Sequence, residues 1–256
     1  MTIKLQAFQL RPASLRGRNI LVTGATSGLG RALALACARA SATVILSGRN
    51  LAKLEKVYDE IEALGAPQPA IAPLDLATAT APEYDGLAAL IGREFGVLDG
   101  LVHSAALLGE RTPLEQYDIP TWCRVLHVNL TAPLILTQVL LPQLRKSPAA
   151  SVLFVSSGVA HDPRPYWGAY AVSKAGLDSV RSLLSQELTG VSTVRVNSVS
   201  PGRLRTPMRA AAYPAEDPNT VPSADSVTDA FLYLLSEDSR SIAGQCVTLT
   251  DARRLP

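Results

Sequence analysis

Short apolar runs alternate with segments of helical periodicity along almost the whole chain, and this alternation restricts the folds that it can adopt. Parallel strands need a crossover connection, usually a helix, between one strand and the next, so the alternation predicts a parallel sheet. The seven predicted strands lie at 19–24, 42–48, 69–75, 97–105, 151–157, 192–201 and 245–251.

The segments between these strands predict helices that cover both faces of the sheet. They lie at 28–40, 51–65, 82–95, 166–189 and 225–236, with one further long helix that ends near Pro148. Gly190 ends the helix at 166–189, whose apolar stripe is formed by Leu177, Val180, Leu184 and Leu188. The sequence therefore predicts an α/β fold, a doubly wound sheet of seven mostly parallel strands, in one domain over residues 1–256. Residues 1–16 form an N-terminal extension in this interpretation.

The composition agrees with one compact domain that has a sizeable core. Of 256 residues, 47% are hydrophobic and 18% are charged, and 24 lysines and arginines face 22 aspartates and glutamates for a formal charge of +2. So small a charge supplies no strong field to collect nucleic acid or acidic lipid. We expect no nucleic-acid partner and no membrane partner.

The cysteines and the N-terminal sequence indicate a cytoplasmic protein. Cys37, Cys123 and Cys246 form no CxxC pair and leave an odd count, which suits a reducing compartment and buried structural thiols. The N-terminus has no apolar core followed by a small-residue cleavage site. No later run approaches the ~20 apolar residues of a membrane span.

The stretch TGATSGLG (23–30) joins the first predicted strand to the first predicted helix. Its glycines, Gly24, Gly28 and Gly30, would let the backbone approach a pyrophosphate at the positive N-terminus of that helix. The spacing is not that of the G-x-G-x-x-G fingerprint, and a glycine turn is also a common structural device. The position in the first strand–helix unit favours a nucleotide site.

The stretch SGRN at the end of the second predicted strand indicates which nicotinamide nucleotide would bind. An acidic residue about 20 positions after the glycine turn binds a ribose 2′-hydroxyl, whereas an arginine accommodates a 2′-phosphate. Gly48 stands at the position of the acid, and Arg49 follows it. A guanidinium suits a phosphate, so the sequence favours NADP(H) over NAD(H). The alternative interpretation of Arg49 is a solvated charge after a strand.

The stretch YAVSK (170–174) places a tyrosine and a lysine four positions apart. On a helix both side chains lie on one face, about one turn apart. A neighbouring cation favours the phenolate and lowers the pKa of a tyrosine from ~10. Tyr170 beside Lys174 could therefore transfer a proton at neutral pH. Because any amphipathic helix can carry such a pair on its solvated face, other residues must converge on it to indicate function.

These motifs together resemble those of the short-chain dehydrogenase/reductase family, over residues 17–250. The matching features are TGATSGLG, YAVSK, a serine thirteen positions before the tyrosine, and PG after the sixth strand. GAYAVSKAGL and MRAAAYPAEDP further resemble the YciK-like bacterial oxidoreductases. The resemblance implies a Rossmann-type fold and an NADP(H)-dependent oxidoreductase that transfers a hydride between nicotinamide and a carbonyl or alcohol substrate. It also implies a homodimer or homotetramer.

The resemblance implies a role for individual residues of this chain. Tyr170 would be the acid/base, Lys174 would lower its pKa and hold the nicotinamide ribose, Ser157 would orient the substrate carbonyl, and Asn129 would hold a proton-relay water. Ser156 would face the other side of its strand. The residues expected at the cofactor are Gly24, Thr26, Ser27, Gly28, Leu29, Gly30, Arg49, Asp75, Leu76, Ser104, Ala105, Ala106, Tyr170, Lys174, Pro201, Gly202, Leu204 and Thr206.

One motif departs from the family pattern and leads to a second hypothesis. Where the family has Asn-Asn-Ala-Gly after the fourth strand, this chain reads HSAA (103–106). The family's glycine permits a close backbone approach that Ala106 obstructs in part. A nucleotide-binding regulator or scaffold with little turnover is therefore the alternative function. His103 is expected to be a packed strand residue.

A serine hydrolase is a third and weaker hypothesis, because His161 and Asp162 follow Ser157 closely. Residues so near in sequence seldom form a triad, and the chain has no G-x-S-x-G elbow. No histidine, cysteine or carboxylate spacing is typical of a metal site, so we expect no metal. Residues 206–225, rich in proline and alanine, are predicted to form a lid over the substrate.

Overall fold

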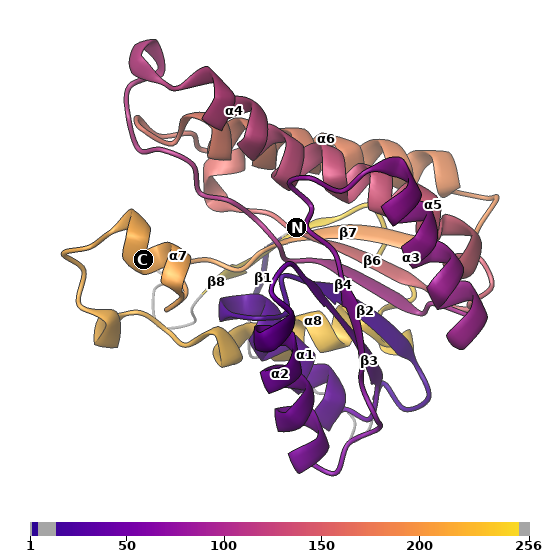
Figure 1. The fold of residues 1–256 in the computed structure, drawn as a ribbon. Coiled ribbons are helices and arrows are strands. Elements are labelled where there is room, and N and C mark those ends of the chain that lie inside the picture. The colour runs from indigo at the N-terminus through magenta and orange to yellow at the C-terminus, as the bar shows by residue number, and fades with distance from the viewer. Residues whose placement is uncertain (1, 5–13, 251–256) are drawn as a thin grey trace.

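The computed structural model describes residues 2–4 and 14–250, and within them eight strands form one sheet (Figure 1). The strand order is β1-β8-β7-β6-β5-β2-β3-β4, and every neighbouring pair is parallel. The seven predicted strands are confirmed as β2 (Asn19–Thr23), β3 (Thr43–Gly48), β4 (Ala70–Pro73), β5 (Gly100–His103), β6 (Ser151–Val155), β7 (Arg195–Ser200) and β8 (Cys246–Thr250).

An eighth strand, within the segment predicted as an N-terminal extension, joins the seven predicted strands in the sheet. β1 (Thr2–Lys4) pairs with β8 at one edge of the sheet. The sequence does not announce it, because three residues are too few to establish an alternating pattern. Part of the N-terminal segment therefore belongs to the sheet.

Helices cover both faces of the sheet and bury two separate apolar clusters (Figure 1). One face carries α1 (Gly28–Arg39), α2 (Leu51–Ala63) and α8 (Thr228–Leu235), and the other carries α3 (Ala81–Glu94), α4 (Ile119–Leu126), α5 (Ala132–Leu144) and α6 (Gly168–Leu188). The predicted stripe on α6 packs in the second cluster, where Leu177 and Leu188 are buried. The short α7 (Pro207–Ala212) lies outside both layers.

The long helix that was predicted to end near Pro148 is interrupted at its middle. α4 ends at Leu126, one π-helical turn covers His127–Thr131, and α5 continues to Leu144. Such single π turns inside helices are frequent at functional sites. Asn129 lies in this turn.

The same stretch, Ile119–Leu144, is long and apolar enough to cross a membrane by length and composition alone, which the sequence analysis did not anticipate. Its mean hydropathy is 1.5, and 44% of the apolar window is buried inside the protein. α4 packs against α6 and α5 packs against α3. These contacts are those of a core helix in a globular domain.

The strand order reverses between β2 and β5, and this reversal determines where a ligand can bind. From β2 the chain moves through β3 to β4 at one edge, whereas β5 to β8 extend toward the other edge. In open α/β sheets the crevice outside the carboxyl ends of the strands at such a switch point is the usual ligand site. The fold therefore predicts a ligand site at the carboxyl ends of β2 and β5.

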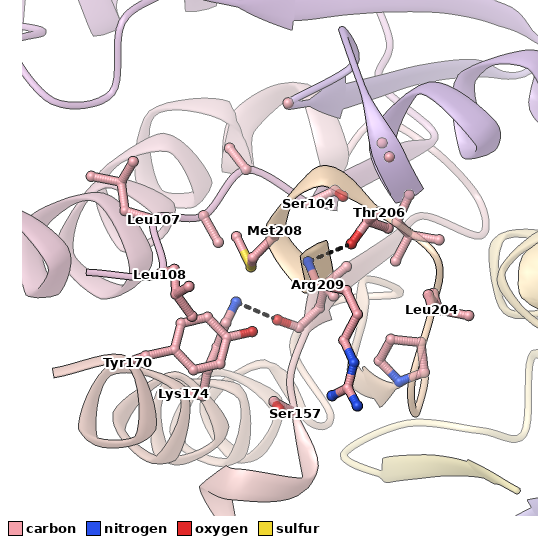
Figure 2. A pocket seen from close by; sticks show the side chains of 18 of the residues that line it. Ser104, Leu107, Leu108, Ser157, Tyr170, Lys174, Leu204, Thr206, Met208 and Arg209 are labelled. Atoms are coloured by element: carbon pink, nitrogen blue, oxygen red, sulfur yellow. Dashed lines mark hydrogen bonds between the residues drawn. The ribbon is translucent and has the colours of Figure 1, made fainter. Parts of the chain in front are cut away.

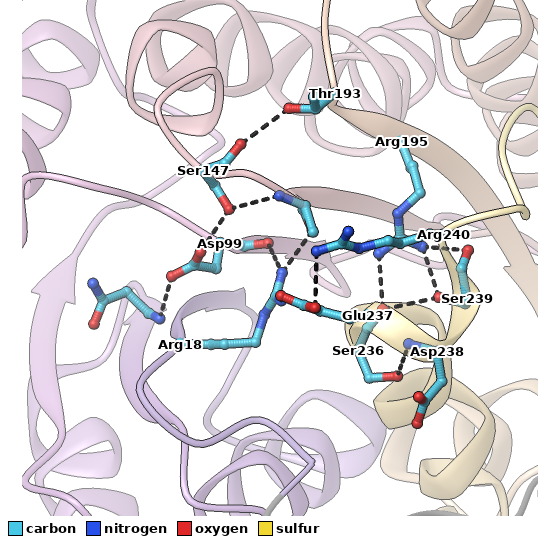
Figure 3. Close-up of polar contacts among 12 residues, drawn as sticks. Arg18, Asp99, Ser147, Thr193, Arg195, Ser236, Glu237, Asp238, Ser239 and Arg240 are labelled. Carbon is cyan, nitrogen blue, oxygen red and sulfur yellow. Dashed lines mark hydrogen bonds and ion pairs between the residues drawn. The ribbon is translucent and has the colours of Figure 1, made fainter.

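Two buried arginines hold together the amino ends of the strands, opposite the carboxyl ends where the ligand site is expected (Figure 3). Arg18, just before β2, donates to the carbonyl of Ala149 at 2.6 Å. Asp99 accepts hydrogen bonds from Asn19 N and Ser147 Oγ. Arg195, at the start of β7, donates to the backbone carbonyls of Leu234, Ser236 and Ser239 at 2.9 to 3.1 Å. The network supplies donors to carbonyls at the end of α8.

Replacing the second of these arginines should destabilise the fold. We expect Arg195→Met to lower the free energy of unfolding by ~2–4 kcal/mol, because buried carbonyls would lose their donors. Arg240→Met is the matched control, since its exposed guanidinium pairs with Glu237 at the surface and should contribute less than ~1 kcal/mol. Urea denaturation measures both, and equal losses would contradict the structural role of Arg195.

Candidate functional site

A cleft of about 550 Å³ runs along the carboxyl ends of the strands. Every residue predicted for the cofactor lines it, as do Ser157, Tyr170 and Lys174. Asn129 is the one predicted site residue that does not line it. The predicted residues therefore converge in space, although they come from the ends of six strands and from α6.

The glycine turn between β2 and α1 is packed so closely that side chains would not fit. Gly24 has a φ of +66°, and a Cβ there would lie 2.8 Å from Ala105 Cα. A Cβ on Gly30 would lie 2.2 Å from the carbonyl oxygen of Gly24. These contacts explain the glycines at 24 and 30 by packing as well as by ligand approach.

The N-terminus of α1 opens into the cleft with its positive end uncompensated. Ser27 is the N-cap residue, but its side chain makes no capping hydrogen bond, and the first turn contains no acidic residue. The first backbone N–H groups of a helix lack intrahelical acceptors and favour an anion. This end of the cleft fits a pyrophosphate.

Gly48 and Arg49 lie beside this turn at the end of β3. A Cβ on Gly48 would lie 3.4 Å from Thr26 Cγ2, so the structure leaves room for a Cβ there. Arg49 is exposed at the wall of the cleft. Among the described residues no carboxylate pairs with its guanidinium, which therefore remains available to an anion.

Asp75 and Leu76 line the cleft after β4. The carboxylate of Asp75 accepts a hydrogen bond from Ala77 N at 3.0 Å, and its carbonyl accepts from Thr78 N and Ala79 N. Asp75 is thus a turn former, a role typical of aspartate at a strand end. Its carboxylate has a second oxygen for a ligand.

Tyr170, Ser157 and Lys174 lie together on one wall of the cleft (Figure 2). Burial raises the pKa of Tyr170 to about 12, although a hydrogen bond from Ser157 opposes the rise. The nitrogen of Lys174 lies 5.6 Å from the centre of the tyrosine ring. Burial outweighs the hydrogen bond from Ser157, so the phenol is protonated at neutral pH. The pKa of Tyr170 differs in direction from the expectation based on YAVSK.

The ammonium of Lys174 is fully enclosed and bound to the backbone. Nζ donates to the carbonyl of Val155, the last residue of β6, at 2.7 Å. Burial lowers the pKa of Lys174 to about 8, and the charge of Asp178 opposes this shift. One of its three N–H groups is committed to Val155, which leaves two for other acceptors.

The two neighbouring serines at the end of β6 face different surroundings. Ser156 is buried and donates through Oγ to Asp178 Oδ2 at 2.7 Å. Ser157 is the residue that shares a hydrogen bond with Tyr170. This difference follows the alternation of side chains along a strand. It puts Ser157, rather than Ser156, beside the phenol.

Asn129 lies behind the wall of the cleft and braces the loop that follows β5. Its Nδ2 donates to the carbonyl of Leu107 at 2.9 Å and to Ser173 Oγ at 3.0 Å, and its Oδ1 accepts from Leu107 N at 2.7 Å. The side-chain amide is thereby occupied by protein partners. The proton-relay role of Asn129 stays a prediction.

The HSAA segment packs closely against neighbouring parts of the chain, although its residues depart from the family pattern. His103 is buried, stacks on Phe154 with ring centres 4.8 Å apart, and contacts Thr137 Oγ1 at 2.9 Å. Burial lowers the pKa of His103 to about 3, so it is a neutral core residue. Thr23 Oγ1 accepts from the N–H groups of Ser104 and Ala105. Ala106 remains at the surface of the cleft.

The sequence indicates a basic group formed by Arg203, Arg205 and Arg209, but not the contacts that basic and aromatic side chains make at the mouth of the cleft. Arg209 forms two hydrogen bonds with Glu216 at 2.6 and 2.7 Å and lies over the ring of Tyr213. Arg111 lies over the rings of Trp167 and Tyr213, at 4.5 and 4.9 Å from their centres. Loop residues carry no periodic signal, and the pairing of Arg111 with residues of 206–225 depends on the tertiary fold.

His161 and Asp162 do not form a catalytic triad with Ser157. His161 Nε2 lies 3.2 Å from Asp178 Oδ2, and neither His161 nor Asp162 lines the cleft. Asp162 is exposed and pairs with Arg164 at 3.7 Å. The geometry that a serine hydrolase requires is absent from the described residues.

Comparison of the chain with known protein families agrees with this arrangement. The family model for short chain dehydrogenases matches residues 18–217. The chain belongs to the short-chain dehydrogenase family. This short-chain dehydrogenase is 40% identical to the oxidoreductase YciK of Escherichia coli K12 over 247 residues, which are 96% of this chain and 97% of YciK. It is therefore an oxidoreductase that acts on small-molecule substrates, and its similarity to YciK-like proteins is confirmed.

Solved structures of short-chain dehydrogenases confirm the fold. One from Pseudomonas syringae has a TM-score of 0.93 and 46% identity, covering 94% of this chain and 98% of that chain. One from Escherichia coli CFT073, in complex with NADPH, has a TM-score of 0.91 and 40% identity, covering 93% and 99%. One from Shigella flexneri 2a, in complex with NADP, has a TM-score of 0.90, the same identity and the same coverage.

The buried lysine of this short-chain dehydrogenase should produce a defined pH dependence of stability. Because the pKa of Lys174 falls from 10.5 to about 8 on folding, folding opposes its protonation below pH 8, and this cost disappears as the pH rises toward 10.5. We expect the unfolding free energy of the parent, minus that of Lys174→Met, to rise by about 3 kcal/mol over this window. Denaturant titrations at several pH values measure the difference. A difference between the parent and Lys174→Met that stays constant from pH 8 to 10.5 would contradict the assignment.

Proposed function

We propose that the protein is an NADP(H)-dependent oxidoreductase that transfers a hydride between nicotinamide and a carbonyl or alcohol substrate. One observation carries the proposal: a protonated phenol, a serine hydroxyl and a buried ammonium share a cleft with an open helix N-terminus and an arginine that no carboxylate of the described residues pairs with. The first three suit proton transfer at a carbonyl oxygen, and the last two suit the phosphates of NADP(H). The NADP and NADPH complexes of the similar proteins support the choice of cofactor.

Each residue of the proposed site contributes a separate step to carbonyl reduction. The nicotinamide supplies the hydride when bound. Ser157 and Tyr170 donate hydrogen bonds to the carbonyl oxygen, and their stabilisation strengthens as negative charge develops there. Tyr170 then transfers its proton to the oxygen. A pKa of about 12 keeps this proton on the phenol at neutral pH until it is transferred.

Lys174 and the glycine turn would hold the nucleotide in this mechanism. The two N–H groups of Lys174 that Val155 does not use are available to the nicotinamide ribose. The N-terminus of α1 would bind the pyrophosphate, and Arg49 the 2′-phosphate. The walls formed by Asp75 and Leu76 and by Pro201, Gly202, Leu204 and Thr206 would contact the adenine and nicotinamide ends.

We further propose a cytoplasmic homodimer or homotetramer. The three cysteines form no disulfide with one another, as suits a reducing compartment. Ile119 on α4 and Val172 and Leu183 on α6 are exposed apolar side chains, which supports an interface on these helices. Light scattering in solution tests the assembly, and a monomeric mass at micromolar protein would refute it.

A nucleotide-binding regulator is the second candidate, and the departure at HSAA favours it. NADPH titration followed by a panel of carbonyl compounds separates the candidates. The enzyme should bind NADPH and oxidise it only when a carbonyl substrate is present. Saturable NADPH binding without oxidation across a broad panel would favour the regulator, and no binding of either nucleotide would contradict both.

The proposed cofactor choice depends on the end of β3. Arg49→Ala should weaken NADPH binding much more than NADH binding, because only NADPH carries the 2′-phosphate. Gly48→Asp should shift the preference further toward NADH, since the carboxylate repels a phosphate and can bind a ribose hydroxyl. Fluorescence titration with both nucleotides measures the ratio of dissociation constants. Equal losses for both nucleotides would exclude the assignment of Arg49.

Residues 206–225 are proposed to close over bound substrate. Thr206, Met208 and Arg209 face Tyr170 across the pocket (Figure 2), and Arg209 and Glu216 hold the segment together through two hydrogen bonds. With NADP and a substrate analogue both bound, limited proteolysis within 206–225 should slow relative to the free protein. Unchanged cleavage at verified saturation would count against the lid.

A further inference from the structure

Three potential metal ligands meet outside the cleft, on the other side of the end of β6. His161 follows the short 3-10 turn Gly158–Ala160, Asp178 lies in α6, and Cys246 begins β8. His161 Nε2 lies 3.2 Å from Asp178 Oδ2 and 3.2 Å from Cys246 Sγ, and the sulfur lies 3.9 Å from the same carboxylate oxygen. None of the three side chains lines the cleft.

These separations match those of ligands that share one small metal ion. Metal–nitrogen and metal–oxygen bonds of ~2.0–2.2 Å and a metal–sulfur bond of ~2.3 Å in a tetrahedral site place the ligand atoms ~3.3–3.6 Å apart. The three observed separations bracket this range. A cation could contact all three atoms with shifts of a few tenths of an ångström.

The burial of Asp178 gives an independent reason to expect a ligand. Its side chain is 7% exposed, yet Oδ1 has no hydrogen-bond partner among the described residues, while Oδ2 accepts from Ser156. A buried carboxylate oxygen without a partner is costly. A cation bound at this carboxylate would offset that cost.

The charges and the open space around the cluster also suit a divalent cation. A carboxylate and a thiolate together balance a charge of +2, and the imidazole is neutral when it binds a metal. Arg181 faces the same groove, but its Nη1 is bound to the carbonyl of Gly244. The groove has a volume of about 370 Å³ and is open to solvent at His161, so water can complete the coordination.

We propose that His161, Asp178 and Cys246 bind a divalent transition-metal ion of the Zn²⁺ type, with water as the fourth ligand. A mixed nitrogen, oxygen and sulfur donor set selects such ions over Mg²⁺ or Ca²⁺, which prefer oxygen alone. The positions 161, 178 and 246 match no known spacing of metal ligands. For this reason the sequence analysis expected no metal. The proposal is independent of the reaction proposed for the cleft.

The proposed metal site would be linked to the wall of the cleft, because its residues are close in sequence to Lys174 and Ser157. Asp178 lies one helical turn after Lys174, and its partner Ser156 directly precedes Ser157. The ion would therefore fix the end of β6 to α6 behind the reacting groups. Its presence would stabilise the folded protein, because a ligand that binds only the native state raises the free energy of unfolding.

Binding of Co²⁺ and Zn²⁺ to the full-length protein, freed of metal with a chelator, tests the proposal. The sulfur ligand should give a thiolate-to-cobalt charge-transfer band in the near ultraviolet at one equivalent of Co²⁺, and one equivalent of Zn²⁺ should abolish it. Cys246→Ser should remove the band. His161→Gln, at an exposed position that should not affect folding, should weaken Zn²⁺ binding at least ~10-fold.

Cys123→Ser is the matched control, because Cys123 is the exposed cysteine of the chain and lies in α4, away from the cluster. It should leave the band and the Zn²⁺ affinity unchanged. Loss of the band in Cys123→Ser alone, no band in the parent, or unchanged Zn²⁺ affinity in both His161→Gln and Cys246→Ser would overturn the proposal. In that case the three side chains form only a hydrogen-bonded cluster.

Discussion

Burial of the Lys174 ammonium is the constraint around which the rest of the site is arranged. A charge enclosed in the protein must have polar partners, and here the carbonyl of Val155 accepts its hydrogen bond while the carboxylate of Asp178 lies one helical turn away. The bond to Val155 fixes α6 against the end of β6. Tyr170 and Ser157, which flank this contact on the two elements, are thereby brought within hydrogen-bond reach of each other.

The sheet makes this contact possible because all its strands point the same way. Each crossover returns the chain to the same end of the sheet before the next strand begins. The carboxyl ends of β2, β3, β5 and β6 therefore all open into one cleft. At the amino ends of the strands, hydrogen bonds of Arg18, Asp99 and Arg195 satisfy buried backbone carbonyls and amides. Stability and the proposed chemistry therefore lie at opposite ends of the same strands, as is usual in parallel α/β folds.

Much of this arrangement could be predicted from sequence, because it depends on local patterns. The apolar runs predict seven strands, and the glycine turn, SGRN and YAVSK mark residues that do line the cleft. The features that the sequence did not reveal depend on tertiary contacts. β1 is too short for a pattern, and the π turn at His127–Thr131 interrupts a continuous helical periodicity. Burial raises the pKa of Tyr170, whereas the sequence alone places a lysine beside it and predicts a lowered pKa. The meeting of His161, Asp178 and Cys246 joins residues that are 85 positions apart.

The most direct test of the account is the proton transfer by Tyr170. NADPH binding and the single-turnover rate of reduction are measured for the parent and for Tyr170→Phe, with whichever carbonyl compound the parent reduces. Because the substitution removes one hydroxyl and keeps the ring, NADPH affinity should be retained while the rate falls by ~10²–10⁴. A Tyr170→Phe protein that binds NADPH and reduces the substrate at the parent rate would contradict the account.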